Sequence, residues 1–459
     1  QRGIAMQNRQ TWSEHIPDPM VLIFAILVVC GILTHLVPAG EYARTEVNGI
    51  TQLVPDSFRY IENSGASFID IFVAIPKGMV EASQYLFIVF IAGGLFHLIN
   101  STGALENAVG TMIRKVGYQS HVSIIVITTF VFGFFGATVG FENNIALVPI
   151  GAVVGRAIGG GAILGAGMAI GGIGIGFALS PINPYTVGVA QQIAELSLFS
   201  GATFRLLLLL VSLVALCIYL VNQNKKLQVE NNVDHTNMGK PITDYTIGKK
   251  DKRVLFLFVA GMAFMLFGVF SYGWYINEIA GVFLAMAIVI GVSIRMSANE
   301  IVEKLMEGAS SVTPGALVIG VAAAIKVILD DGQITDTLVR SLSQLIEGMP
   351  ESISAVLMSV VQGLINFFIP GGSGQALVTM PIMVPLGDNL EISRQVTVLA
   401  FQIGDGLTNL IVPTSGGTLA MLAMANVSYS DWLKFIFKYI LIVYSISWIF
   451  VVLAVVTGY

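Results

Sequence analysis

Apolar runs of bilayer-spanning length recur along this chain. Residues 204–221 and 435–456 are predominantly apolar on every side of a helix, and about 20 such residues cross a hydrocarbon core as an α-helix. Outer-membrane strands would instead alternate apolar and polar side chains over about 10 residues. Only 11% of the residues are charged, less than half the roughly 25% of a soluble domain. The sequence therefore predicts an all-α polytopic membrane protein.

Charge and motif content argue against several other functions. With 23 basic and 28 acidic residues, the chain lacks the positive footprint of a nucleic-acid partner. Cys30 and Cys217 lie far apart in different apolar runs, and the histidines show no i, i+4 pairing, so we expect neither a disulfide framework nor a metal site. The glycines of 159–161 and 171–176 precede no Walker lysine, which favours close helix packing over nucleotide binding. Because no Ser/His pair or paired aspartate suited to catalysis lies within the apolar runs, we expect no enzyme and no cofactor.

The distribution of Lys and Arg orients the chain in a membrane. Residues 39–66 contain two basic and four acidic residues, whereas residues 222–253 contain seven basic and four acidic ones. Cytoplasmic loops are enriched in Lys and Arg, so the first segment is expected to be external and the second cytoplasmic. The N-terminus of this multi-pass protein then lies in the cytoplasm and the C-terminus outside.

The expected organisation has five segments. They are an N-terminal helix with an external loop (1–66), a first repeat (67–221), a cytoplasmic linker (222–253), two linking helices (254–295) and a second repeat that ends in a C-terminal helix (296–459). The lipid bilayer is the expected environment of all the apolar segments.

Each repeat contains two apolar stretches that are interrupted in the middle. The stretches 123–157 and 354–386 are interpreted as re-entrant helical hairpins with polar tips at 140–144 and 370–375. The stretches 164–194 and 396–425 are interpreted as discontinuous helices, broken at 180–184 and 412–417. Irregular backbone at membrane depth is tolerated only where it lines a cavity or is buried in protein. We therefore expect the functional site where the four breaks meet.

An internal repeat relates the two halves. Adding 232 to a position in the first half pairs Gly140 with Gly372, and it also matches two prolines, Pro149 to Pro381 and Pro181 to Pro413. A shift of 229 places residues 103–105 on residues 332–334. The spans that precede these two segments run in opposite directions in the expected orientation, which predicts an inverted-topology repeat.

Two acidic residues lie within these interrupted stretches. Glu142 is in the first hairpin tip, and Asp405 lies between two glycines shortly before the second helix break. A carboxylate at membrane depth costs at least about 2.5 kcal/mol, so a role as proton carrier, cation ligand or substrate partner is the default. In the alternative, either acid faces a water-filled vestibule or pairs with a basic group such as Lys326 or Arg156.

Neutral polar residues gather at the same breaks. They are Asn143, Asn144, Asn183, Thr186, Ser373, Gly374, Gln375, Asn409, Thr414, Ser415 and Thr418. Half-helices that begin after a break point N–H groups toward an anionic substrate, and freed carbonyl groups can hold Na⁺. We expect these residues to bind substrate together with Glu142 and Asp405, and Na⁺ to lie near Asn143, Ser180, Ser373 or Thr414. For each residue the alternative is a helix cap or an interhelical hydrogen bond.

The interrupted stretches resemble a known family. The matching segments are 140–155 (GFENNIALVPIGAVVG), 171–191 (GGIGIGFALSPINPYTVGVAQ), 368–386 (FIPGGSGQALVTMPIMVPL) and 401–418 (FQIGDGLTNLIVPTSGGT). They are similar to the YfcC proteins of the DcuC-type anaerobic carrier family, in the ion transporter superfamily. The resemblance implies a homodimer whose protomers each combine a scaffold with a mobile transport domain that moves like an elevator. Distant members carry Ser-Asn-Thr at both hairpin tips, whereas this chain has Glu142-Asn143-Asn144 and Ser373-Gly374-Gln375.

The additional acid at the tip bears on the expected substrate. Two unit charges about 6 Å apart at an effective dielectric constant of 20 repel by about 3 kcal/mol, so Glu142 and Asp405 would disfavour a dianion and favour a cationic group. We therefore expect a secondary transporter of a small carboxylate-bearing solute, most simply an amino acid such as arginine or ornithine, moved by exchange or by ion coupling. If the acids instead carry coupling protons, an H⁺- or Na⁺-coupled dicarboxylate or short-chain carboxylate carrier remains open. A channel is the remote alternative, because it would need a continuous polar pore.

Overall fold

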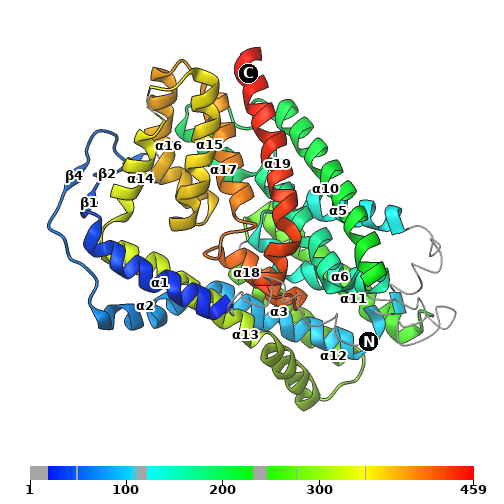
Figure 1. Ribbon diagram of the computed structural model, residues 1–459. Helices are drawn as coiled ribbons and strands as arrows, with labels where there is room; N and C mark the ends of the chain where they lie inside the picture. Colours follow the sequence, from blue (N-terminus) through cyan, green and yellow to red (C-terminus); the bar gives the residue numbers. More distant parts are fainter. Residues whose placement is uncertain are drawn as a thin grey trace, which may run out of the picture.

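The computed structural model describes residues 19–47, 50–105, 107–108, 111, 121–230, 246–274, 276–346 and 348–459. Most of this part of the chain is helical (Figure 1). Within it, seven helices are long and apolar enough to cross a membrane, or eight if the bent helix α13 counts as one span. Residues 1–18 of the expected N-terminal segment and residues 231–245 of the expected cytoplasmic linker lie outside the described residues.

The helices follow the expected order of spans and breaks. The first half contains α1 (Pro19–Leu36), α2 (Phe68–Glu81), α3 (Ser83–Ser101), α5 (His121–Val139), the 3₁₀-helix η2 (Glu142–Leu147), α6 (Val148–Ala157), α7 (Gly161–Ala166), the π-helical turn η3 (Gly167–Gly171), α8 (Gly172–Ala178), the π-helical turn η4 (Pro184–Gly188), α9 (Val189–Ile193) and α10 (Ala202–Glu230). Two linking helices follow, α11 (Lys249–Tyr272) and α12 (Ile276–Ser293). The second half contains α13 (Ala298–Asp331), α14 (Thr335–Gln344), α15 (Glu351–Phe368), α16 (Gly372–Asn389), α17 (Arg394–Thr408), α18 (Gly416–Ala425) and α19 (Tyr429–Thr457).

The expectation of an all-α protein is wrong for the expected external segment, 39–66, which contains β-strands. It contains four short strands, β1 (Gly40–Glu41), β2 (Arg44–Val47), β3 (Ile50–Leu53) and β4 (Arg59–Tyr60), which form the antiparallel pairs β1–β4 and β2–β3. Val47 pairs with Ile50, so two residues connect β2 to β3. Those residues are Asn48-Gly49, the dipeptide most typical of a two-residue hairpin connection. The sequence therefore carried a local hairpin signal that the hydropathy argument did not use.

The helices α2 and α3 pack antiparallel along α13. A Cβ added to Gly78 would lie 2.5 Å from the backbone nitrogen of Ala324, and one added to Gly93 would lie 3.0 Å from the carbonyl oxygen of Gly308. Small residues allow helix backbones to approach this closely. Figure 1 shows the resulting layer of long helices along one side of the molecule, with α1 beside α13.

The element order repeats itself once. Adding 230 to 68 and to 101, the ends of the α2–α3 pair, gives 298 and 331, the ends of α13. The helices that close the two halves, α10 and α19, have 29 residues each. In each half, one hairpin region and then one broken helix lie between the opening helices (α2–α3 or α13) and the closing helix (α10 or α19). This order agrees with the internal repeat predicted from the proline pairs; the repeat and the opposite orientation of its halves across a bilayer stay predictions.

The hairpin tips correct the residue pairing of the repeat. Gly140 and Gly371 both have positive φ angles, 106° and 117°, a conformation that residues with a Cβ rarely adopt. The shift of 232 paired Gly140 with Gly372, but Gly372 is instead the first residue of α16. The equivalent turns are therefore Gly140 and Gly371, one residue earlier than the sequence identities suggested.

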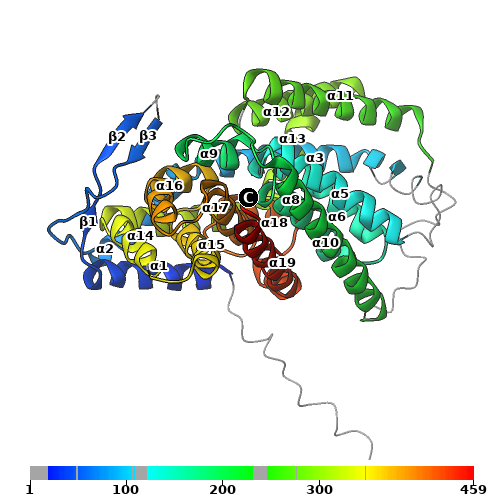
Figure 2. The ribbon, with the colours of Figure 1, turned by 90° about the horizontal axis from the view of Figure 1, so that it is seen from above.

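The broken helices pack against the helices that flank the tips. The helix α5 lies along α8, α6 lies along α7, and both α15 and α16 lie against α17. A Cβ on Gly172 would lie 2.8 Å from the carbonyl oxygen of Thr129, which confirms that this glycine-rich run serves close helix packing. In Figure 2 the helices α14 to α17 lie on one side of α19, and α5, α6, α8 and α10 lie on the other.

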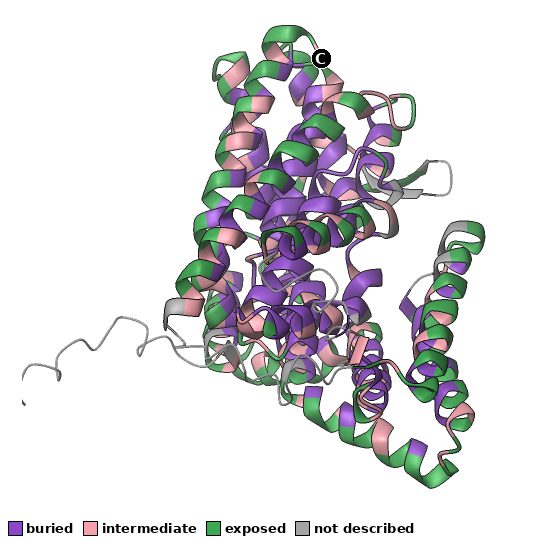
Figure 3. Ribbon diagram, turned by 90° about the vertical axis from the view of Figure 1, so that its right-hand side faces the viewer, coloured by how far each residue is buried: buried purple, intermediate pink, exposed green. Residues whose placement is uncertain are grey.

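Burial separates the interior from the outer helices. Figure 3 shows buried residues concentrated in the middle of the molecule and exposed residues along the outward faces of the peripheral helices. Large apolar side chains such as Leu207 and Val214 on α10, and Phe256 and Val259 on α11, are among the exposed ones. An exposed apolar surface of this kind suits contact with lipid.

Candidate functional site

A cavity of about 240 Å³ lies where the long helices meet the helix breaks. One wall comes from α2, α3 and α13 and includes Glu81, Tyr85, Ile319 and Lys326; we call it the long-helix wall. The other comes from the hairpin tips and the break between α17 and α18, and includes Glu142, Gly371, Asn409, Thr414 and Ser415; we call it the tip wall. The expected meeting of the breaks at one site is thus seen for both hairpin tips and the second break.

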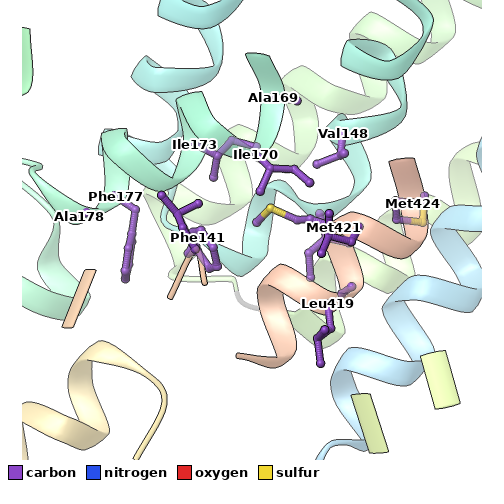
Figure 4. Packing of buried hydrophobic residues seen from close by; sticks show 14 of the residues in the cluster. Phe141, Val148, Ala169, Ile170, Ile173, Phe177, Ala178, Leu419, Met421 and Met424 are labelled. Atoms are coloured by element: carbon purple, nitrogen blue, oxygen red, sulfur yellow. The ribbon is translucent and has the colours of Figure 1, made fainter. Parts of the chain in front are cut away.

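Glu142 is half-buried and lines the cavity. Its Cγ atom lies 3.2 Å from the position that a Cβ on Gly417 would take, so the acid lies over the first turn of α18. The N-terminus of a helix carries partial positive charge and unpaired N–H groups, which favour a nearby carboxylate. Phe141, the residue before Glu142, is buried and packs against Phe177 of α8 with ring centroids 5.3 Å apart (Figure 4). This apolar contact holds the first tip against the broken helix.

Asp405 lies behind the tip wall in the interior of α17. Its side chain is fully buried, and neither carboxylate oxygen has a hydrogen-bond partner among the described residues. The Oδ2 atom lies 3.0 Å from the position that a Cβ on Gly372 would take, so the carboxylate faces the first turn of α16. Thr186 of η4, directly after the first break, lies against the same position. The second tip, η4 and Asp405 therefore meet at one point.

Amides and hydroxyls connect Asp405 to the cavity. The Nδ2 atom of Asn366 donates to the backbone oxygen of Asp405 at 2.9 Å and to Oδ1 of Asn409 at 3.0 Å. Thr414 donates to the carbonyl of Phe367 at 2.9 Å, and Thr418 donates to the carbonyl of Asn409. These bonds fix the irregular backbone of the second break against α15, which leaves Asn409, Thr414 and Ser415 on the cavity wall.

Three of the expected site residues form capping or interhelical hydrogen bonds. Asn144 donates to the carbonyls of Phe135, at 3.2 Å, and Gly140, and Ser180 donates to the carbonyl of Ala137 at 2.7 Å. Gln375 donates to the backbone and side-chain oxygens of Gln362 at 2.8 and 2.7 Å. These are the bonds given as the alternative for these residues, and a role of the three in binding stays a prediction.

The remaining expected residues are buried near the breaks or exposed. Asn143, Asn183 and Thr186 are buried. Ser373 and Gly374 are exposed on the first turn of α16 and do not line the cavity. The expected Na⁺ positions at Ser180 and Ser373 thus have an engaged hydroxyl and an exposed one, respectively.

Among the described residues, Lys326 and Arg156 form no ion pair with Glu142 or Asp405. Lys326 forms ion pairs with Glu81 at 2.5 Å and with Asp330 at 3.0 Å, and Arg156 is exposed at the end of α6. Lys326 and Glu142 nevertheless line the same cavity. Sequence reasoning did not place Glu81 or Asn366 at the site. Asn366 had a usable signal, since it is an amide inside an otherwise apolar helix next to a tip.

A buried cation supports the site from behind. Arg205 of α10 is fully buried and donates to Oε1 of Gln402 at 3.1 Å and to the carbonyl of Ser200 at 2.8 Å. Gln402 in turn donates to the carbonyl of Ser180 at 2.6 Å, in the first break. One hydrogen-bonded chain thus joins α10, α17 and the first break. Its sequence signal was an arginine within an apolar run.

Comparison with known proteins identifies the family. Residues 16–456 match the DcuC family, described as C4-dicarboxylate anaerobic carriers. The chain belongs to the DcuC family. This DcuC-family protein is therefore a multi-pass membrane transporter.

Two curated relatives cover almost the whole chain. One is YfcC of Escherichia coli strain K12, which carries the provisional name of basic amino acid antiporter; it is 30% identical over 93% of this chain and 94% of its own length. The other is an uncharacterized protein of Haemophilus influenzae strain Rd, 26% identical over 94% of this chain and 95% of its own length. The first of these matches bears out the predicted resemblance to YfcC proteins.

Two solved transporter structures resemble the DcuC-family protein more distantly. The Alcanivorax borkumensis YdaH transporter is 14% identical with a TM-score of 0.44, and covers 96% of this chain and 99% of its own. Neisseria gonorrhoeae MtrF is 17% identical with a TM-score of 0.45, and covers 96% of each chain.

Proposed function

We propose that this protein is a secondary active transporter that moves an amino acid with a basic side chain, such as arginine or ornithine, by exchange or by ion coupling. The observation that carries the proposal is Glu142, a carboxylate on the wall of a cavity among the helix breaks. A carboxylate in such a place attracts a cationic group and repels a dianion. The provisional name of the Escherichia coli relative agrees with this substrate class.

The two ends of the substrate meet different parts of the tip wall. Its carboxylate is bound by Asn409, by Ser415 and by N–H groups at the start of α18, because helix N-termini favour anions. Its cationic end faces Glu142. Asp405, which is buried without a hydrogen-bond partner among the described residues, exchanges the coupling ion, H⁺ or Na⁺.

A dicarboxylate or short-chain carboxylate is the second candidate substrate. The description of the family favours it. In this case Glu142 and Asp405 carry protons during transport and are neutral when the anion is bound, which removes the repulsion. The two candidates therefore assign opposite charges to Glu142 in the loaded carrier.

Further parts of the proposal concern motion and assembly. The hairpins 123–157 and 354–386 are re-entrant and move with the broken helices as a transport domain, while the long-helix wall belongs to a scaffold that stays in place. The protein is a homodimer in a bacterial inner membrane, with its N-terminus in the cytoplasm and its C-terminus outside. Labelling of a Tyr459→Cys variant with a membrane-impermeant reagent from the outer side tests the orientation. Chemical cross-linking in membranes tests the dimer.

Counterflow in liposomes tests the substrate. Vesicles loaded with unlabelled ornithine should accumulate labelled arginine transiently, with saturation, and succinate inside should not drive this uptake. The reverse preference would support the dicarboxylate candidate. Flux that does not saturate and shows no counterflow would instead indicate a channel.

A further inference from the structure

The cavity contains charged groups on both walls. Among its lining residues the charged ones are Glu142 on the tip wall and Glu81 and Lys326 on the long-helix wall. Two acids and one base thus surround the cavity. A solute with two cationic groups and one carboxylate is the electrostatic complement of this set.

The ion pair on the long-helix wall is open to exchange. Lys326 lies 2.5 Å from Glu81, and the two side chains are 39% and 44% exposed. Ion pairs with this much solvent contact contribute little to stability. A substrate carboxylate can therefore replace Glu81 at the ammonium group of Lys326 at small cost, and Glu81 becomes available to a cationic group.

The packing of α2 on α13 does not depend on the Lys326–Glu81 ion pair. Lys77 and Asp331 form a second ion pair between α2 and α13, at 2.7 Å, with side chains 53% and 55% exposed. The same two helices are in backbone contact at Gly78. The pair Lys77–Asp331 does not line the cavity, so it provides a matched control on the same helices.

We propose that Lys326 and Glu81 form a second half of the substrate site and determine its specificity. Lys326 adds an ionic contact to the carboxylate of a dibasic amino acid, which Asn409 and Ser415 bind from the tip wall across the same cavity. Glu81 binds the α-ammonium group, and Glu142 binds the cationic end of the side chain. This inference rests on the proposed function and extends the site to the long-helix wall. The substrate then bridges the two walls, so these contacts form only while the walls face each other as they do here.

Binding of arginine and agmatine to the purified full-length protein in detergent tests the proposal. Agmatine keeps both cationic groups of arginine but lacks the carboxylate. Lys326→Gln should weaken arginine about tenfold or more, because a hydrogen-bonded charge pair is lost, and should leave agmatine within about twofold, so the arginine-to-agmatine ratio falls. Glu81→Gln should weaken both ligands. Lys326→Arg should restore the ratio, and Lys77→Gln should leave it unchanged.

An unchanged arginine-to-agmatine ratio in Lys326→Gln would overturn the inference, whether both affinities fall or neither does. The proposed function fails separately if the wild-type protein binds succinate and neither arginine nor ornithine. If Lys326 binds a substrate carboxylate in that case too, Lys326→Gln should weaken the affinity for succinate about tenfold, whereas Lys77→Gln should not. An undiminished succinate affinity in Lys326→Gln would overturn the inference in that case.

Discussion

The carboxylate of Asp405 faces Gly372 so closely that a Cβ at position 372 would lie 3.0 Å from its Oδ2 atom. Glu142 has a similar relationship with Gly417, with a distance of 3.2 Å from its Cγ atom. In both cases an acid lies over the first turn of a helix, and a glycine provides the space. The two acids are therefore held at helix N-termini from different parts of the chain.

The first prediction concerns this space. Gly372→Ala places a methyl group against Asp405 and Thr186, and overpacking of an interior contact costs about 1–3 kcal/mol. We expect counterflow to fall by about tenfold or more while the protein still elutes as a single species in detergent. Gly374→Ala is the matched control, since a Cβ there meets nothing within 4 Å. Equal activity of the two variants would contradict the placement of Asp405 at this contact.

The second prediction concerns coupling. Asp405→Asn removes the buried charge without changing the size of the side chain, so the fold should persist and ion-driven uptake should be abolished. Uptake in vesicles under an imposed H⁺ or Na⁺ gradient measures this. Asp388→Asn, which changes an exposed carboxylate paired with Arg394 at 2.9 Å, should keep its uptake. Wild-type uptake by Asp405→Asn would refute the role of Asp405.

The third prediction concerns recognition of the substrate side chain. Glu142→Gln should weaken arginine about tenfold or more and should affect citrulline, whose side chain is neutral, much less. Competition against labelled arginine in vesicles gives both values. The control is Glu351→Gln, at an exposed acid on the first turn of α15. An equal loss for both ligands would argue against charge recognition by Glu142.

The fourth prediction concerns stability. Arg205→Ala leaves the side-chain oxygen of Gln402 without its donor and removes one of two donors to the carbonyl of Ser200, which keeps its bond from Gln191. Hydrogen bonds to a charged group contribute about 1.5–3 kcal/mol. The midpoint of thermal unfolding in detergent should fall by several degrees, whereas Arg156→Ala, at an exposed position, should leave it unchanged. Arg205→Lys should rescue only part of the loss, because an ammonium group lacks the planar fork of guanidinium. A full rescue by lysine would show that charge alone is required.

The sequence was most informative about where helices are interrupted. Proline and glycine act through local backbone geometry, so the break around Pro181 and its counterpart around Pro413 could be located without knowledge of the packing. The strands at 40–60 were missed because hydropathy averages over a window, whereas a hairpin is specified by a dipeptide such as Asn48-Gly49.

The composition of the site was less predictable. An amide such as that of Asn144 can cap a tip or bind a ligand with the same atoms, and only the position of the neighbouring carbonyls decides between these roles. Glu81 and Lys326 are 245 residues apart in sequence, and their common wall results from the packing of α2 on α13. No local pattern reports such a contact.

The backbone contact between α3 and α13 at Gly93 and Gly308 has a mechanical consequence. Two helices whose backbones touch resist separation, because dispersion contacts are lost along the whole interface. If the transport domain moves as proposed, we expect the displacement to occur across the cavity between Lys326 and Glu142. A cross-link between α3 and α13 should therefore leave turnover intact, whereas one that bridges this gap should stop it.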